Sequence, residues 1–215
     1  MAVICPTITA FDPHEYREQM ERAARLDKRV RIHIDLMDGE FAPTKSPELE
    51  GVWWPHHVTA DIHLMYKRPM EHLEALIRLK PHMVIIHNEA DVHHMHFAAE
   101  LHKHGIKTGL ALLADTPEEW AEQIMHSFDH LLIFSGHLGY HGGAADLGLL
   151  AKAKKAKAHH PELEISWDGG INAENARALA DGGVDVLNVG GFIQKSANPE
   201  KAYATLKEAL KTEGK

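Results

Sequence analysis

Short apolar runs alternate with longer amphipathic segments from one end of the chain to the other. Several of the longer segments open with Asp, Thr or Asn next to Pro, which is the chemistry of a helix start. The runs predicted as strands are Val3–Ile8, Val30–Asp35, Ala60–Leu64, Met83–His87, Thr108–Leu112, His130–Phe134, Glu164–Asp168 and Asp185–Val189. Segments predicted as helices include Pro13–Leu26, Pro69–Leu79, Pro117–His126, Ala144–His159, Ala173–Asp181 and Pro199–Leu210. This alternation indicates a parallel sheet with helical crossovers.

Eight such repeats leave two architectures open, a closed (β/α)₈ barrel and a doubly wound open sheet. The repeats fill the chain, and no linker, low-complexity tract or charge block divides its 215 residues. A (β/α)₈ barrel can occupy the whole of a chain of this length. The pattern therefore favours an α/β fold, a single-domain (β/α)₈ TIM barrel over residues 1–215.

Charge and cysteine content restrict the partners of such a domain. The formal net charge of −8 disfavours nucleic acid and anionic membranes as partners, because an acidic protein repels polyanions. No apolar stretch approaches the ~20 residues that span a bilayer. The single cysteine, Cys5, cannot form an internal disulfide, so we expect a cytoplasmic protein. We also expect a homo-oligomer, and we interpret the histidines of the polar stretch His93–His104 as surface residues.

In a barrel of this type the chemistry lies where the strands end and the following loops begin. Residues Ile32–Gly39 end the second predicted strand, Asp61–Met65 end the third, and Ser166–Ile171 end the seventh. Because strand side chains alternate, His33 and Asp35 point the same way, into the barrel mouth. We therefore expect a functional site at this end of the barrel.

Two imidazoles and two carboxylates are predicted to meet at that opening, namely those of His33, Asp35, His63 and Asp168. This donor set suits one divalent zinc, iron, manganese or cobalt ion. Each residue alone is weak support, since Asp35 could cap a helix and Asp168 could stabilise the turn before Gly169. Buried carboxylates without partners are costly, so the conjunction favours a cation or a substrate between them.

Glycine pairs follow the last two predicted strands, Gly169–Gly170 after the seventh and Gly190–Gly191 after the eighth. Loops at these positions commonly bind phosphate in such barrels, and glycine lets a ligand approach the backbone closely. Either pair alone is more often a simple turn. Because the two pairs stand at adjacent strand ends, they favour a phosphate site, which would supply the local attraction that an anionic substrate needs on an acidic protein.

These residues resemble the motifs of the ribulose-phosphate 3-epimerase family. The run His33–Gly39 is similar to the signature H-x-D-x-M-D-G, and His63–Met65 is similar to the H-L-M motif. His87–Ala90 resembles the H-x-E-A strand end, and Asp168–Ile171 matches D-G-G-I. Cys5–Ile8 stands where the family usually has S-P-S-I. The matches follow the family order over nearly the whole chain, so together they are specific.

The resemblance implies a ribulose-phosphate-binding barrel in which His33, Asp35, His63 and Asp168 hold one divalent metal ion. It also implies that Asp35 and Asp168 are the acid and base that invert C3 of a phosphorylated ketose, through a metal-stabilised enediolate. The chemistry agrees, because epimerisation removes a proton beside a ketone and returns one to the opposite face. The expected reaction is D-ribulose 5-phosphate to D-xylulose 5-phosphate. The expected substrate contacts are Thr7, Met37, Met65, Gly142, Gly143, Gly169, Gly170, Gly190 and Gly191.

The sixth loop departs most from the family pattern. The family has N-P-G-F-G-G-Q there, whereas residues 135–143 read S-G-H-L-G-Y-H-G-G, so that His137, Tyr140 and His141 are new. In the family this loop closes against the phosphate end of the substrate. The identity of the sugar phosphate is therefore left open by the sequence.

Other functions stay compatible with the pattern. One is an epimerase of another ketose phosphate, such as a hexulose 6-phosphate, and another is a non-catalytic metal-binding barrel. Decarboxylase-like relatives typically place a lysine beside acidic residues at strand ends, and the segment around Asp35 has none. Met37 and Met65 do not distinguish these functions. They could form apolar walls around a reacting sugar, or they could simply fill the core, and both explanations fit equally well.

Overall fold

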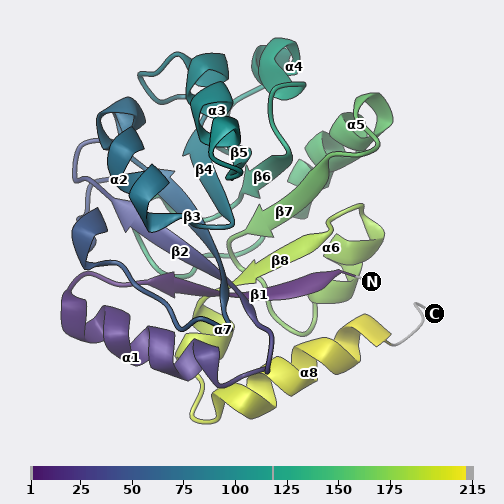
Figure 1. The fold of residues 1–215 in the computed structure, drawn as a ribbon. Coiled ribbons are helices and arrows are strands. Elements are labelled where there is room, and N and C mark those ends of the chain that lie inside the picture. The colour runs from purple at the N-terminus through teal and green to yellow at the C-terminus, as the bar shows by residue number, and fades with distance from the viewer. Residues whose placement is uncertain (1, 118, 212–215) are drawn as a thin grey trace.

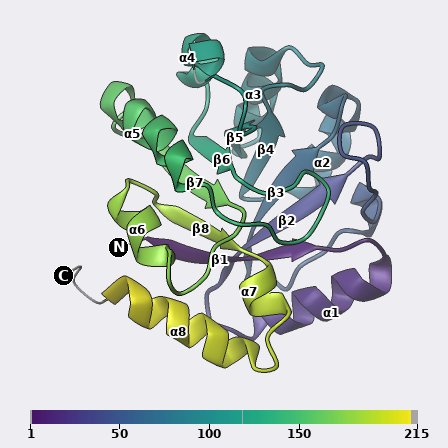
Figure 2. The same ribbon diagram turned by 180° about the vertical axis from the view of Figure 1, so that it is seen from behind.

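Eight parallel strands pair in sequence order, and the eighth pairs with the first, so the sheet closes into a barrel. The computed structural model describes residues 2–117 and 119–211, and positions 1, 118 and 212–215 of the predicted domain lie outside these ranges. Helices surround the strands in Figure 1, and Figure 2 shows the same ring from behind. The predicted (β/α)₈ TIM barrel is confirmed, and the open sheet is excluded.

The observed strands follow the predicted runs closely. The strands are β1 Val3–Thr9, β2 Arg31–Met37, β3 Thr59–Met65, β4 Met83–His87, β5 Lys107–Leu112, β6 His130–Phe134, β7 Glu164–Asp168 and β8 Val186–Val189. The α-helices are α1 Pro13–Ala24, α2 Leu73–Leu79, α3 His94–Lys103, α4 Glu119–Met125, α5 Leu150–His159, α6 Ala176–Asp181, α7 Gly191–Gln194 and α8 Pro199–Lys211. Short 3₁₀ turns are η1 Leu49–Gly51, η2 Pro69–His72 and η3 Leu147–Leu149. Within the described ranges, no helix is long and apolar enough to cross a bilayer.

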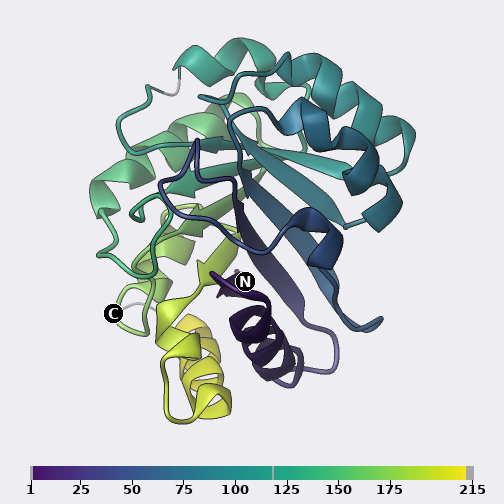
Figure 3. The ribbon, with the colours of Figure 1, turned by 90° about the vertical axis from the view of Figure 1, so that its left-hand side faces the viewer.

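Local sequence explains where α1 begins. The Asp12 side chain accepts hydrogen bonds from the backbone N–H groups of His14 and Glu15, and Pro13 occupies the first helical turn, where its missing N–H is not needed. Both α1 and α8 contact β1, and they lie on the same side of the barrel (Figure 3). The two ends of the chain thus cover the seam where β1 meets β8.

Alternating side chains of the strands divide between two interiors. On β2, Ile32, Ile34 and Leu36 are buried in the large apolar core between the barrel and its helices. The intervening His33 and Asp35 are buried inside the barrel instead. The inside of the barrel is therefore partly polar, and its polar groups need partners.

The polar groups at the amino end of the barrel satisfy one another. Arg31 forms a two-pronged ion pair with Glu164, at 2.8 and 2.7 Å, and its Nε lies 2.5 Å from Asp61 Oδ2. His130 Nδ1 lies 2.8 Å from Glu164 Oε2. This network connects β2, β3, β6 and β7 at the closed end of the barrel. The carboxylates at the opposite end are then the ones that can face a ligand.

Candidate active site

The four predicted metal-binding side chains meet at the carboxyl end of the barrel. His33 and Asp35 come from β2, His63 from β3 and Asp168 from β7, and one donor atom of each lies within 4.8 Å of the others. Asp35 and His63 are register partners in the β2–β3 ladder, so they stand side by side. His33, Asp35 and His63 are buried, while 13% of the Asp168 side chain is exposed toward the cavity mouth.

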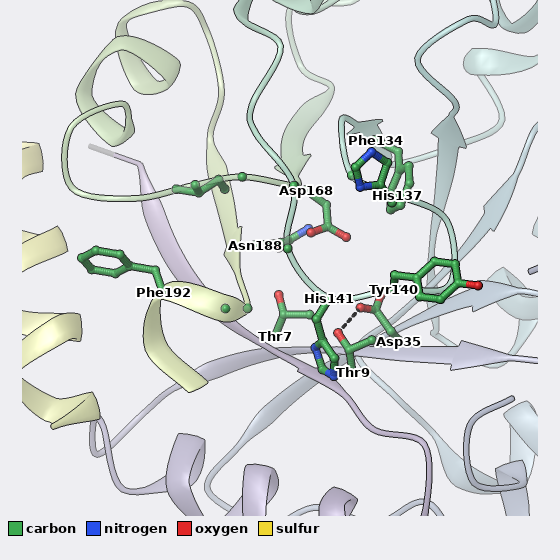
Figure 4. A pocket seen from close by; sticks show the side chains of 18 of the residues that line it. Thr7, Thr9, Asp35, Phe134, His137, Tyr140, His141, Asp168, Asn188 and Phe192 are labelled. Atoms are coloured by element: carbon green, nitrogen blue, oxygen red, sulfur yellow. Dashed lines mark hydrogen bonds between the residues drawn. The ribbon is translucent and has the colours of Figure 1, made fainter. Parts of the chain in front are cut away.

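Asp35 is the centre of this cluster. Its Oδ1 lies 3.2 Å from His33 Nε2 and 2.9 Å from His63 Nδ1, and its Oδ2 accepts a hydrogen bond of 2.7 Å from the Thr9 hydroxyl (Figure 4). Burial alone would raise the pKa of Asp35, but the contacts with the two imidazoles outweigh it and hold that pKa far below its usual value. Asp35 is therefore ionised at neutral pH.

Asp168 experiences the opposite environment. Burial and the negative charge of Asp35 raise the pKa of Asp168 to about 7, and His33 Nε2, 3.9 Å away, only partly offsets this effect. Without a cation nearby, one of the two carboxyl groups is thus ionised and the other holds a proton near neutral pH.

The donor set fits a divalent cation. His33 Nε2 is buried and has no hydrogen-bond partner among the described residues, although it faces the carboxylates of Asp35 and Asp168. Two imidazole nitrogens and two carboxylate oxygens are ligands that zinc and related ions accept. A positive charge here would also relieve the repulsion between the two carboxylates. The residues present therefore suit one ion.

His63 has neighbours on both edges of its ring. Burial, the largest cause, lowers the pKa of His63 to about 4, so the imidazole is neutral. Its Nε2 lies 2.9 Å from Nε2 of His87, at the end of β4. His87 belongs to the segment His87–Ala90 that resembles the H-x-E-A strand end of the family, but the sequence indicates no role for it.

The cluster opens into a cavity of about 290 Å³. This is near the lower end of the ~300–1,000 Å³ of pockets that hold small ligands, so a small substrate fits better than a nucleotide. Thr7 and Asn188 line it (Figure 4), and the Thr7 hydroxyl oxygen and the Asn188 amide nitrogen are buried without a protein partner among the described residues. Both groups can bind polar atoms of a substrate.

Glycines form the other end of the cavity. The predicted phosphate-site positions Gly169, Gly170, Gly190 and Gly191 all line it, as do the predicted substrate contacts Gly142 and Gly143. Gly169 and Gly170 have φ values of 113° and 68°. A β-carbon on Gly169 would lie 2.3 Å from the Gly136 nitrogen, and one on Gly170 would lie 2.1 Å from the Ala145 nitrogen. The sixth and seventh loops therefore touch through their backbones, which only glycine permits here.

Lys195 contributes the positive charge that the glycine end otherwise lacks. Among the described residues that line the cavity, Lys195 is the only lysine or arginine. It follows α7, a helix of one turn that the sequence pattern did not predict. Because the sequence pattern does not predict α7, it does not distinguish Lys195 from the other lysines of the chain.

The sixth loop crosses the mouth of the cavity. The Thr44 hydroxyl donates a hydrogen bond of 2.5 Å to the Gly139 carbonyl, which ties the loop to the segment after β2. On the β1 side, His141 Nε2 lies 3.5 Å from Glu15 Oε1, and the His141 ring meets Phe11 edge-on at 5.1 Å. His137, Tyr140 and His141 all line the cavity (Figure 4). The residues that depart from the family pattern are thus part of the candidate site.

The structure places most of the predicted substrate contacts on the cavity wall. Thr7 and Met65 line it together with the six glycines, whereas Met37 packs with Ala42 and Met65 and is not among the lining residues. Thr9 and Asn188 line it although the sequence did not single them out. Each is separated by two positions from a predicted contact, Thr9 from Thr7 and Asn188 from Gly190, so strand alternation could have found them.

Comparisons with known proteins point to one family. The family model described as the Ribulose-phosphate 3 epimerase family matches residues 3–194. The ribulose-phosphate 3-epimerase of Helicobacter pylori is 32% identical over 212 residues, which cover 94% of this chain and 95% of that protein. The enzyme of the same name from Bacillus subtilis is 30% identical over 185 residues, covering 82% of this chain and 85% of the relative.

Solved structures share the fold at lower identity. A 3-hexulose-6-phosphate synthase superposes with a TM-score of 0.73 at 18% identity and covers 97% of this chain and 99% of its own. The orotidine 5'-monophosphate decarboxylase of Sulfolobus solfataricus has a TM-score of 0.65 at 12% identity, with 98% of each chain covered. At these identities the similarity concerns the barrel alone.

Proposed function

Since the chain belongs to the ribulose-phosphate 3-epimerase family and is an isomerase, we propose that it interconverts D-ribulose 5-phosphate and D-xylulose 5-phosphate with one divalent metal ion bound. The observation that supports this most directly is the pairing of Asp35 with Asp168. Two carboxyl groups share one cavity, and their pKa values are shifted in opposite directions. Such a pair is what an epimerase needs, one group to remove a proton and one to deliver a proton.

The roles of the two acids follow from their surroundings. Ionised Asp35, held by the Thr9 hydroxyl, takes the proton from C3 of the sugar. Asp168, whose pKa is raised while that of Asp35 is lowered, returns a proton to the opposite face, and the roles exchange in the reverse direction. His33, Asp35, His63 and Asp168 would hold a divalent ion, which would supply positive charge to stabilise the negative charge that develops on the sugar as the proton leaves.

The rest of the cavity suits the remainder of the substrate. Thr7 and Asn188 present unpaired polar atoms in the middle, where sugar hydroxyl groups would lie. Lys195 and the glycine backbones of the sixth, seventh and eighth loops surround the far end, where a phosphate dianion would lie. A local positive charge also explains how a protein of net charge −8 attracts an anionic sugar.

A second candidate substrate is a hexulose 6-phosphate. The observation that favours it is the sixth loop, whose His137, Tyr140 and His141 replace the usual family residues and line the cavity. A different wall beside the glycine end would allow a phosphate group to bind at a different distance from Asp35 and Asp168. A six-carbon ketose phosphate would differ from a pentulose phosphate in this distance.

The test measures turnover and metal content on the same sample. We expect D-ribulose 5-phosphate to be converted by the isolated protein, to be unconverted after chelation, and to be converted again after Zn²⁺, Mn²⁺ or Co²⁺ is added. Unphosphorylated D-ribulose should have a much lower kcat/KM. Turnover by protein that metal analysis shows to be free of ions would contradict the metal requirement. Turnover of a hexulose 6-phosphate without turnover of D-ribulose 5-phosphate would assign the second candidate.

A further inference from the structure

Asn188 is the one polar residue of strand β8. Its neighbours Leu187 and Val189 belong to the apolar core outside the barrel, so Asn188 points into the barrel. The residue is 2% exposed, and its amide nitrogen is buried without a hydrogen-bond partner among the described residues. An unpaired donor in the interior costs stability, and an apolar side chain of similar size would avoid that cost. A ligand therefore explains this asparagine better than folding does.

Asn188 lies between the acid–base pair and the glycine end of the cavity. Its register partner on β7 is Asp168, so the two side chains stand next to each other. On the other side it pairs with Cys5 of β1, and Thr7 follows two residues further along that strand. A β-carbon on Gly190 would lie 3.6 Å from Cβ of Thr7, so the glycine end begins there. Figure 4 shows Asn188 between Asp168 and Thr7, on the wall of the cavity.

The chemistry of a pentulose phosphate leaves one group for this position. With C3 between Asp35 and Asp168, and the phosphate on C5 at the glycine end, only C4 and its hydroxyl group remain between them. A hydroxyl group has two lone pairs and one proton. It can accept a hydrogen bond from the Asn188 amide and share a second one with the Thr7 hydroxyl, whose oxygen is also buried without a partner among the described residues. One substrate group would satisfy both atoms.

We propose that Asn188 is a specificity-determining residue, which selects ketose phosphates with a hydroxyl group on C4 by donating a hydrogen bond to its oxygen. This role rests on the proposed function, which places C3 at the two aspartates and the phosphate at the glycines. Epimerisation at C3 leaves C4 unchanged, so the contact is the same with both epimers. Such a contact strengthens binding of the substrate and the transition state equally, and it lowers KM without raising kcat.

Two ligands that differ by one hydroxyl group test this role in the wild-type protein. The probes are D-ribulose 5-phosphate and its 4-deoxy analogue, and the measurement is the affinity of the isolated protein for each by calorimetry. We expect the analogue to bind about 10–100-fold more weakly, because it leaves the buried amide of Asn188 unpaired. Equal affinities would overturn the inference and leave the proposed function intact. Failure of both ligands to bind would contradict the proposed function, and the inference with it.

Asn188→Leu removes the donor at nearly constant volume. The affinity for D-ribulose 5-phosphate should fall by about tenfold or more, while the affinity for the 4-deoxy analogue should stay as in the wild type, so that the preference shrinks. Asn88→Leu is the matched control, because Asn88 is a half-buried asparagine after β4 that does not line the cavity. It should keep the wild-type preference. An undiminished preference in Asn188→Leu would overturn the inference.

Two further measurements distinguish substrate binding from a structural role. Because the Asn188 amide nitrogen has no partner among the described residues without a ligand, Asn188→Leu should leave the urea midpoint of the ligand-free protein unchanged or raise it. In turnover, KM for D-ribulose 5-phosphate should rise while kcat changes little. A lowered midpoint with equal losses of affinity for both ligands would assign Asn188 to the fold instead. A fall in kcat at unchanged KM would assign it to the chemistry, and either result overturns the inference.

Discussion

Asp35 and Asp168 face the same cavity, yet their surroundings shift their pKa values in opposite directions. Asp35 lies against two imidazoles and the Thr9 hydroxyl, which favour its charged form over the effect of burial. Burial and the negative charge of Asp35 both disfavour the ionised form of Asp168. In the proposed reaction this difference would make Asp35 the base and Asp168 the acid.

Replacing either aspartate by asparagine should reduce the rate of epimerisation by at least ~10²-fold, the lower range for loss of a general acid or base. Asparagine keeps an oxygen that can bind an ion but cannot transfer the proton. The measurement is kcat for D-ribulose 5-phosphate, with metal content determined for each variant. Near wild-type rates in metal-loaded Asp35→Asn and Asp168→Asn would exclude the two-aspartate mechanism.

Solvent exchange distinguishes proton transfer from simple ion binding. A variant that retains one of the two groups can still exchange the C3 hydrogen with deuterated solvent on the face of that group. It should form no epimer, because inversion needs a donor on the opposite face. Mass spectrometry of the recovered substrate measures this exchange. If both variants exchange C3 and also form epimer, another pair of residues transfers the protons.

The raised pKa of Asp168 predicts a pH-dependent stability of the metal-free protein. The unfolded carboxyl group has a pKa of about 3.9, whereas the folded one has a pKa of about 7. The folded state therefore holds a proton that the unfolded chain releases. The resulting stabilisation is complete below about pH 4 and is lost as the pH rises through about 7. Urea denaturation of metal-free protein should show its midpoint falling over this interval.

Asp168→Asn is the matched control for that experiment. Asparagine does not titrate, so this part of the pH dependence should disappear. Saturating Zn²⁺ should also remove it in the wild-type protein, because a cation favours the ionised carboxylate. An equal fall of the midpoint in Asp168→Asn and wild type would show that another group is responsible.

Local signals explain why the barrel could be predicted from the sequence. Apolar runs of strand length mark the strands, and Asp12-Pro13 marks the start of α1 through capping. Helix α7 was missed because it is one turn long and begins with glycine, a poor helix former. The helix predicted from Ala144 begins only at η3 and α5, since the backbone at Ala144 and Ala145 packs against Gly170.

Two rules allowed part of the site to be predicted: side chains alternate along a strand, and functional residues lie at strand ends. These two rules brought together His33, Asp35, His63 and Asp168. They could not show that His87 contacts His63, because this depends on the stagger between β3 and β4, in which His63 pairs with Ile85. Neighbouring barrel strands are offset along their length, and the offset is a property of the closed sheet rather than of one segment.

Lys195 should contribute to binding of the phosphate rather than to chemistry. Lys195→Met removes the only lysine or arginine among the described residues of the cavity wall. A hydrogen bond to a charged group contributes about 1.5–3 kcal/mol, so kcat/KM for the sugar phosphate should fall by about 10–100-fold, mainly through KM. Lys201→Met, on α8 next to the cavity but not lining it, should have little effect. Equal losses for unphosphorylated D-ribulose would contradict a phosphate role for Lys195.

The ion network at the amino end of the barrel should be essential for stability. Arg31 pairs with Asp61 and Glu164 inside the barrel, where 13% of the Arg31 side chain and 3% of the Asp61 side chain are exposed. Arg31→Met leaves a buried carboxylate without its cation, which typically costs about 3–5 kcal/mol. Urea denaturation should show a loss of this size, while the cavity at the other end is unchanged.

Arg68→Met is the control that shows whether the loss of stability in Arg31→Met comes from burial of the ion pair or from its two-pronged geometry. Arg68 also forms a two-pronged pair with a glutamate, Glu40, but both side chains are about half exposed, at 47% and 50%. Water screens such a pair, so the urea midpoint should hardly change. A triple variant, Arg31→Met with Asp61→Asn and Glu164→Gln, should recover part of the stability lost in Arg31→Met, because it removes the uncompensated charges. If the triple variant is less stable than Arg31→Met alone, the network stabilises the barrel through its hydrogen bonds and packing rather than by pairing buried charge.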